Sequence, residues 1–321
     1  MHYRRLGRTG LKVSEISLGA WVTFGSQLDE QSAINLFHAA YDQGINFFDN
    51  ADMYAEGRAE TVMGKAMQGI PRQALVISSK VFFPTFPGPN GKGLSRKHIF
   101  DSVHESLKKL GTDYIDLYFC HRYDPDTPME EVVRTMTDLV SQGKIMYWGT
   151  SKWTGSQVVS AITLARQFNG VPPAMEQCRY NMLDRRSVEV DLSFAVKEFG
   201  IGLTSFSPLA YGLLSGKYNN GIPEGSRASM PEMAWVKDHI TPLAIGKVRE
   251  VGVVAAELGL TPAQLAIAWI LRRKEVSSVI TGASRVEQLD ENIQAGEAVN
   301  KLTDDVLETI EKILSNHPEE E

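Results

Sequence analysis

Eight short apolar runs alternate with segments whose apolar residues recur at helical spacing along almost the whole chain. The runs that we expect to form strands cover residues 16–19, 46–49, 75–80, 114–121, 145–150, 174–180, 202–206 and 276–280. Among the helical segments, residues 95–110 have both end signals, because Ser95 can cap the helix and Gly111 can end it. Residues 127–130 and 261–264 have the pattern of capping boxes at two further helix starts. Eight strands that alternate with helices predict an α/β fold, a closed (β/α)8 TIM barrel.

Further elements are expected around the barrel. Residues 3–13 are expected to form an N-terminal β-hairpin, with its turn at residues 7–10, that plugs the bottom of the fold. One helix is expected near residues 190–199, and extra C-terminal helices follow the last repeat, the final one capped by Thr303. Barrels of this kind commonly have about 200 to 400 residues. Since no linker interrupts the 321 residues, we expect a single domain over residues 1–321.

Composition excludes several classes of protein. The net charge of -6 gives no basic excess for nucleic acid, and no run reaches the ~18 apolar residues of a membrane-spanning helix. Without a signal-peptide core we expect a soluble, cytoplasmic protein. Cys120 and Cys178 stand far apart and are expected to be buried thiols, and the seven histidines show no metal-binding spacing, so no metal is expected. No GxGxxG follows the first strand, so a nicotinamide cofactor could not be held in the Rossmann manner.

Polar residues end three of the expected strands. Asp49, Lys80 and His121 each follow an apolar run, and Tyr54 lies five residues beyond Asp49. A carboxylate at the end of an apolar strand needs a cation nearby, and Lys80 can supply it. Because the carboxyl ends of barrel strands meet at one face, we expect a site at the mouth of the barrel. Taken singly, Asp49 and Lys80 could form a structural ion pair, and Tyr54 and His121 could be ordinary packed residues.

Asp49, Tyr54, Lys80 and His121 match the four catalytic positions of the aldo-keto reductase superfamily in identity, order and approximate spacing. The resemblance covers almost the whole chain. More narrowly, four segments are similar to the branch that contains the voltage-gated potassium channel β-subunits and their bacterial reductase relatives; they are residues 21–25, 93–99, 146–151 and 207–210. Together these motifs are highly specific, although each alone would be weak.

The resemblance implies hydride transfer from NADPH to an aldehyde or ketone. Tyr54 is then the proton donor, and we expect the Lys80 ammonium to lower the pKa of its phenol. Asp49 would keep Lys80 charged, and His121 would orient the carbonyl and donate to its oxygen. The substrate pocket is expected to contain Trp21, Tyr54, Phe82 and His121, an aromatic wall that favours broad carbonyl specificity over a highly charged substrate.

Cofactor-binding positions also follow from the resemblance. Ser151 and Gln177 would bind the nicotinamide amide, and Phe206 would stack on its ring, where the channel-subunit branch usually has tryptophan. Arg285 favours the 2′-phosphate, and hence NADP(H) over NAD(H). The complete set is Trp21, Gln27, Asp49, Ser151, Lys152, Gln177, Phe206, Ser207, Pro208, Leu209, Ala210, Tyr211, Gly212, Lys217, Arg227, Gly282, Ser284, Arg285, Gln288, Glu291 and Asn292.

Two functions are open to such a chain. One is an NADPH-dependent carbonyl reductase, and the other is a cofactor-binding regulatory subunit that senses redox state on a channel. His121 favours the enzyme, because the channel-subunit branch commonly has asparagine there. The sequence starts at the hairpin, so we expect no pore-acting N-terminal extension and no channel partner. A homo-oligomer, a tetramer or larger, is expected by family analogy alone.

Overall fold

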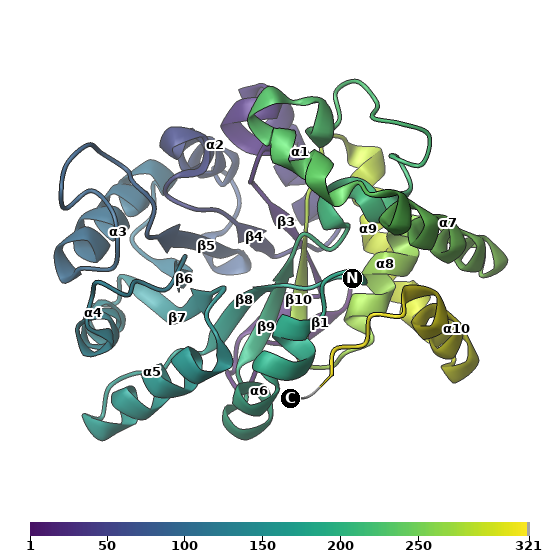
Figure 1. Ribbon diagram of the computed structural model, residues 1–321. Coiled ribbons are helices and arrows are strands. Elements are labelled where there is room, and N and C mark those ends of the chain that lie inside the picture. Colours follow the sequence, from purple (N-terminus) through teal and green to yellow (C-terminus); the bar gives the residue numbers. More distant parts are fainter. Residues whose placement is uncertain (320–321) are drawn as a thin grey trace.

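The computed structural model describes residues 1–319, and their centre is a closed parallel barrel of eight strands (Figure 1). The barrel strands are β3 (Ile16–Gly19), β4 (Phe47–Asp49), β5 (Val76–Val81), β6 (Ile115–Cys120), β7 (Ile145–Ser151), β8 (Met175–Arg179), β9 (Gly202–Phe206) and β10 (Val276–Thr281). Each strand pairs with its neighbours in chain order, and β10 pairs with β3 to close the ring. The predicted (β/α)8 barrel is confirmed.

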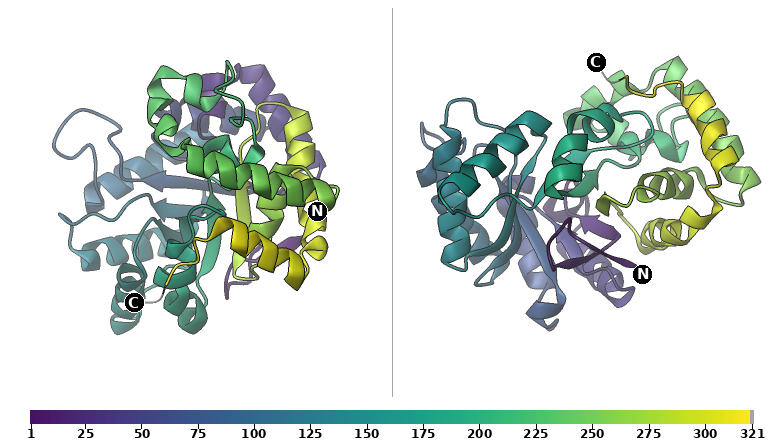
Figure 2. Two further views of the ribbon diagram at one scale, coloured as in Figure 1. Left: turned by 45° about the vertical axis from the view of Figure 1, so that its right-hand side comes forward. Right: turned by 90° about the horizontal axis from the view of Figure 1, so that it is seen from below.

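Helices surround the strands on the outside, as the three views show (Figures 1 and 2). They are α1 (Glu30–Asp42), α2 (Arg58–Ala66), α3 (Arg96–Leu110), α4 (Met129–Ser141), α5 (Gly155–Gln167), α6 (Ser193–Phe199), α7 (Pro242–Glu257), α8 (Pro262–Leu271), α9 (Val286–Ala298) and α10 (Asp304–Leu314). The main apolar core lies between this helical layer and the outer face of the strands. The apolar faces of most helices therefore pack toward the barrel, whereas α10 packs on α7.

An N-terminal hairpin closes the bottom of the barrel, as expected. Its strands are β1 (Tyr3–Arg5) and β2 (Lys12–Ser14). Leu6 and Val13 are fully buried in a second apolar cluster with side chains from inside the barrel, among them Phe47, Val76, Leu117, Phe119, Met175 and Ile280. Gly7 has φ +54°, and a Cβ there would lie 2.3 Å from the Gly200 carbonyl oxygen, so only glycine allows this close approach.

Some of the predicted helix N-caps are present in the structure and others are not. Thr261 caps α8 in the expected capping box with Gln264, and Thr303 precedes α10 but makes no capping hydrogen bond. The prediction of a capping box at residues 127–130 is wrong, because the Thr127 hydroxyl instead donates to Asp124 Oδ2 at 2.8 Å. A capping box that we did not predict opens α5 at Thr154.

The expected helix near residues 190–199 is split in two. A π-helical turn covers Ser187–Asp191, and α6 begins at Ser193. The polar partners of Glu189 give a reason for the break, because this side chain turns into a network of arginines instead of continuing a regular helical face. The break was not visible in the apolar spacing, which continues through it.

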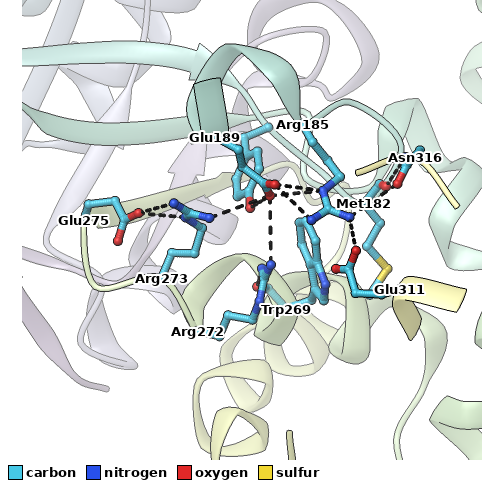
Figure 3. A network of polar contacts seen from close by, with 10 residues as sticks. Met182, Arg185, Glu189, Trp269, Arg272, Arg273, Glu275, Glu311 and Asn316 are labelled. Carbon is cyan, nitrogen blue, oxygen red and sulfur yellow. Dashed lines mark hydrogen bonds and ion pairs between the residues drawn. The ribbon is translucent and has the colours of Figure 1, made fainter. Parts of the chain in front are cut away.

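That network ties the C-terminal helix to the barrel (Figure 3). Arg185 is almost completely buried and binds Glu189 at 2.9 Å and Glu311 of α10 at 2.6 Å. Arg272 and Arg273, after α8, approach Glu189 at 4.0 and 3.8 Å. Although burial opposes it, hydrogen bonds from Arg185 and the Tyr180 hydroxyl hold the pKa of Glu189 below its usual value. The carboxylate therefore stays ionised, and together with Arg185 it links three segments far apart in the sequence.

Among residues 1–319, no single helix has both the length and the apolar character needed to cross a membrane. Helices α7 and α8 meet those criteria only when taken together, and an 88° bend separates them.

Candidate active site

The carboxyl ends of the barrel strands surround a cavity of about 440 Å³. Seven strands supply a lining residue within two residues of their ends: Gly19, Asp49, His121, Ser151, Gln177, Phe206 and Thr281. Trp21 and Tyr54 line the same cavity from the connections after β3 and β4. The structure therefore has a cavity at the mouth of the barrel, where the polar residues at the strand ends predicted a site.

A second cavity of about 490 Å³ continues from the first toward the start of α9. The two share six lining residues: Ser207, Pro208, Tyr211, Arg227, Thr281 and Gly282. They therefore form one long cleft that begins over the barrel and ends beside Ser284 and Arg285. Such a cleft suits an extended ligand with one end at the barrel mouth.

Asp49 and Lys80 form a buried ion pair at the base of the first cavity. Lys80 Nζ lies 2.8 and 2.7 Å from the two Asp49 oxygens, and it also donates to the Asn50 carbonyl at 2.6 Å. Asp49 Oδ1 accepts further hydrogen bonds from the Ser78 hydroxyl and from Gln177 Nε2. The expected pairing is confirmed, and its many hydrogen bonds offset the desolvation of two charges.

Tyr54 lies against this pair, with its hydroxyl 3.3 Å from Lys80 Nζ. We expected Lys80 to lower the pKa of the phenol, but burial and the Asp49 carboxylate raise it well above its usual value. Burial is the larger of the two causes, and Lys80 does not offset it because the Asp49 charge balances the ammonium. Tyr54 therefore keeps its proton at neutral pH, and Lys80 stands next to the oxygen that would become charged on losing it.

His121 is buried at the side of the cavity beside Tyr54, with the two ring centroids 5.9 Å apart. Burial, with the nearby charges of Lys80, Arg122 and Lys152, lowers the pKa of the imidazole well below its usual value. The ring is therefore neutral at physiological pH, with one N–H donor. A neutral imidazole in this place can donate a hydrogen bond to an oxygen in the cavity.

One expected pocket residue is replaced by its neighbour. Phe83 lines the cavity and packs edge-on against His121, whereas Phe82 is not among the lining residues and packs on the main core. Sequence reasoning also missed Met53, Arg122 and Trp235. Arg122 directly follows His121, so its position was a usable signal, but Trp235 comes from a distant segment with no pattern of its own.

Nearly all of the expected cofactor-binding residues line the long cleft. In the first cavity are Trp21, Asp49, Ser151, Lys152, Gln177 and Phe206; in the second are Gln27, Leu209, Gly212, Lys217, Ser284, Arg285, Gln288, Glu291 and Asn292; in both are Ser207, Pro208, Tyr211, Arg227 and Gly282. Ala210 is the exception, since it is buried and does not line the cleft.

Three cationic side chains, Lys217, Arg227 and Arg285, line the second cavity. Burial, together with Arg227 and Arg285, lowers the pKa of Lys217, so the three positive groups act on one another across the cavity. Gly282 lets the chain pass close to this group, because a Cβ there would lie 3.1 Å from Arg227 Nη2. Repulsion between buried cations is relieved by an anion, so the donor set fits the phosphates of a dinucleotide.

Strained backbone gathers at the barrel mouth. Val22, Lys152, Ser207, Ala210 and Tyr211 have φ between 46° and 71°, the left-handed region that side chains other than glycine rarely adopt. All five lie just beyond the ends of barrel strands that line the cleft. Such strain persists where the surrounding structure holds it, and it commonly marks ligand-binding loops.

Asp52 is a second buried carboxyl behind the ion pair. Its backbone N–H donates to the Lys80 carbonyl at 3.3 Å, and its Oδ2 accepts from Ser102 at 2.7 Å. Burial raises the pKa of Asp52 to about 7, against the opposing hydrogen bond from Ser102. The folded chain therefore holds a proton that the unfolded chain loses near its ordinary pKa of about 4.

We expect this proton to make stability fall as the pH rises from about 4 to about 7, with no further loss from this group above pH 7. Asp52→Asn removes the titration, so the variant should exceed the wild type in free energy of unfolding by about 2–4 kcal/mol at pH 8, and by much less at pH 4.5. Urea denaturation at the two pH values measures this. Exposed Asp126→Asn is the control, and an equal effect of Asp52→Asn at both pH values would contradict the assignment.

Among the described residues, no group of three or more histidines, cysteines and acids could hold a metal ion.

Comparison with known proteins adds two findings. The model of the aldo/keto reductase family matches residues 15–315. The chain is also 46% identical over 322 residues to a protein of Arabidopsis thaliana named "Probable voltage-gated potassium channel subunit beta", with 99% of this chain and 98% of that protein covered. Both similarities span the barrel and the long cleft.

Proposed function

The chain belongs to the aldo/keto reductase family, in the branch that resembles potassium channel β-subunits, and from that premise we propose that it is an NADPH-dependent carbonyl reductase. Its family supports oxidoreduction with a nicotinamide cofactor. The proposal goes further in naming NADPH, an aldehyde or ketone as the substrate, and Tyr54 as the proton donor. Asp49, Lys80 and His121 are the supporting catalytic residues in this proposal.

The arrangement of Tyr54, Lys80 and Asp49 at an open cavity is the observation that carries the proposal. Reduction of a carbonyl leaves a negative charge on its oxygen. Tyr54 gives that oxygen a proton, and the resulting phenolate is stabilised by the ammonium 3.3 Å away. The neutral His121 holds the same oxygen with an N–H donor. Because the charges are positioned before the reaction, little reorganisation is needed.

NADPH, when bound, supplies the hydride for the carbonyl carbon. In our proposal Phe206 offers an aromatic face to the nicotinamide ring, and Ser151 and Gln177 bind its amide. Gln177 Nε2 already donates to Asp49 Oδ1 at 2.9 Å, so its carbonyl oxygen is the atom that can accept from the amide. Lys217, Arg227 and Arg285 would bind the phosphates in the second cavity.

Oxidation of NADPH in the presence of 4-nitrobenzaldehyde or methylglyoxal tests the proposal. We expect the absorbance of the reduced nicotinamide to fall, and one molecule of alcohol to form for each molecule of NADPH consumed. Absence of turnover with a panel of aldehydes and ketones, by protein that binds NADPH, would contradict the enzymatic function.

Preference for NADPH over NADH should depend on Arg285, whose side chain is exposed and lies 3.9 Å from Glu287. We expect Arg285→Ala to raise the dissociation constant for NADPH about 10- to 100-fold, since hydrogen bonds between charged groups contribute about 1.5–3 kcal/mol. The constant for NADH, which lacks the 2′-phosphate, should change little. Fluorescence titration with both cofactors measures this, and equal changes would refute the role of Arg285.

The Arabidopsis relative's name supports a second candidate, a regulatory subunit that binds the cofactor and docks on a channel. Turnover distinguishes the two. An enzyme consumes NADPH for many cycles, whereas a redox sensor would bind NADPH and complete about one slow cycle. His121 favours the enzyme, because its N–H can donate to the carbonyl oxygen of a substrate bound in the cavity.

A further inference from the structure

Arg122 lines the first cavity with most of its donors unused. It follows His121 at the end of β6, and its Nη1 donates to the His121 carbonyl at 2.5 Å. The guanidinium lies over the Phe83 ring, 5.2 Å from the centroid, which holds it at the cavity wall. A guanidinium has five N–H donors, and within residues 1–319 this is the side chain's sole hydrogen bond.

No carboxylate of the described chain forms an ion pair with Arg122 or with Lys152, another cation of this cavity. The nearby acids are committed elsewhere. Asp49 is bound to Lys80, and Asp184 pairs with Arg179 at 2.7 Å. Burial raises the pKa of Glu176 to about 8, so this carboxyl, bound by the Thr150 hydroxyl, is mostly neutral at pH 7. The substrate end of the cleft therefore has a net positive charge.

The phosphates of a cofactor would not neutralise Arg122. Arg122 lines only the first cavity, whereas the cations expected to bind phosphate line the second, with Arg227 lining both. Phe83 packs against the Arg122 guanidinium, and Met53 and Trp235 add apolar surface to the same cavity. A half-buried cation among apolar groups is most stable beside an anion, and the ligand can provide one.

We propose that Arg122 binds a carboxylate on the substrate, so that the preferred substrates are small aldehydes or ketones that carry a carboxylate group. The inference rests on the proposed reductase function and names its substrate class. It departs from the uncharged, broad specificity that the aromatic residues alone suggested. The planar guanidinium can donate two parallel hydrogen bonds to a carboxylate, while the preceding residue, His121, binds the carbonyl oxygen.

A matched pair of substrates tests the proposal. 4-Carboxybenzaldehyde and 4-nitrobenzaldehyde have similar planar groups of similar size, but only the first is an anion. Succinic semialdehyde and butanal repeat the comparison on a flexible chain. The quantity measured is the ratio of kcat/KM for the anionic substrate to kcat/KM for the neutral one, with NADPH. Effects of a mutation on chemistry common to both substrates cancel in this ratio.

In the Arg122→Met variant we expect the ratio to fall about 10- to 100-fold through a higher KM for the anionic substrate. Arg122→Lys keeps the charge but loses the paired geometry, so its ratio should lie between those of wild type and Arg122→Met. Arg5→Met is the control, because Arg5 lies on the hairpin at the other end of the barrel and is exposed. An unchanged ratio for both substrate pairs in Arg122→Met would overturn the proposal.

Calorimetric binding of 4-(hydroxymethyl)benzoate in the presence of NADP⁺ gives a readout that needs no turnover. We expect Arg122→Met to weaken this binding about 10-fold or more, and an unchanged affinity would count against Arg122. Failure of the wild type to reduce any of the four aldehydes would instead contradict the reductase function. The two failures are therefore distinguishable.

Discussion

Replacing Tyr54 with phenylalanine should lower kcat for carbonyl reduction by about 10²- to 10⁴-fold, the usual contribution of a positioned general acid. The variant loses the hydroxyl that lies 3.3 Å from Lys80 Nζ and keeps the ring that packs against His121. Binding of NADPH should therefore be nearly unchanged. Steady-state oxidation of NADPH with 4-nitrobenzaldehyde and fluorescence titration of the cofactor measure the two quantities.

Tyr123→Phe is the matched control. Tyr123 lies two residues beyond His121 but packs edge-on against Trp153, and it is not among the residues that line the cavity. We expect its kcat to remain within about twofold of the wild type, since it touches no reacting atom. Undiminished turnover by Tyr54→Phe would exclude Tyr54 as the proton donor.

Lys80→Met should reduce activity about as severely and should also destabilise the fold. The Lys80 side chain is fully buried and donates to Asp49, Asn50 and Tyr54. Its removal leaves the Asp49 carboxylate buried without a cation, which typically costs about 3–5 kcal/mol. Urea denaturation gives the free energy of unfolding, and the NADPH assay gives kcat.

The double variant Asp49→Leu/Lys80→Met separates the two effects. Removing both charges should restore much of the lost stability, because a buried ion pair can often be replaced by apolar residues of similar volume. Activity should not return, since no ammonium then stabilises the phenolate of Tyr54. A fully active double variant would contradict the role of the pair in catalysis.

The strand pattern was sufficient to predict the fold. Each of the eight apolar runs became a barrel strand with bounds close to those expected, and the hairpin at residues 3–13 closes the bottom through Leu6 and Val13. The residues that usually cap helix ends were less reliable predictors. Thr261 caps its helix as predicted, but Thr127 has the same sequence pattern and turns to Asp124 instead.

Polar residues at strand ends likewise predicted which side chains would meet. A charge that ends an apolar strand must find a partner, and in a parallel barrel all such ends lie at one face, so Asp49 and Lys80 could be paired from the sequence. The resemblance to a family supplied the residues from loops, and almost all of them line the long cleft.

The sequence by itself determined the order of the elements and the residues at the barrel mouth, because apolar periodicity and buried charge are properties of short segments. Only the tertiary structure decided that Phe83 faces the cavity, that Tyr54 has a raised pKa, and that no carboxylate within residues 1–319 forms an ion pair with Arg122. These properties depend on burial and on distances between groups far apart in the chain. Desolvation and Coulomb energies change steeply over a few ångströms, and no pattern in the sequence specifies the distances between such groups to that precision.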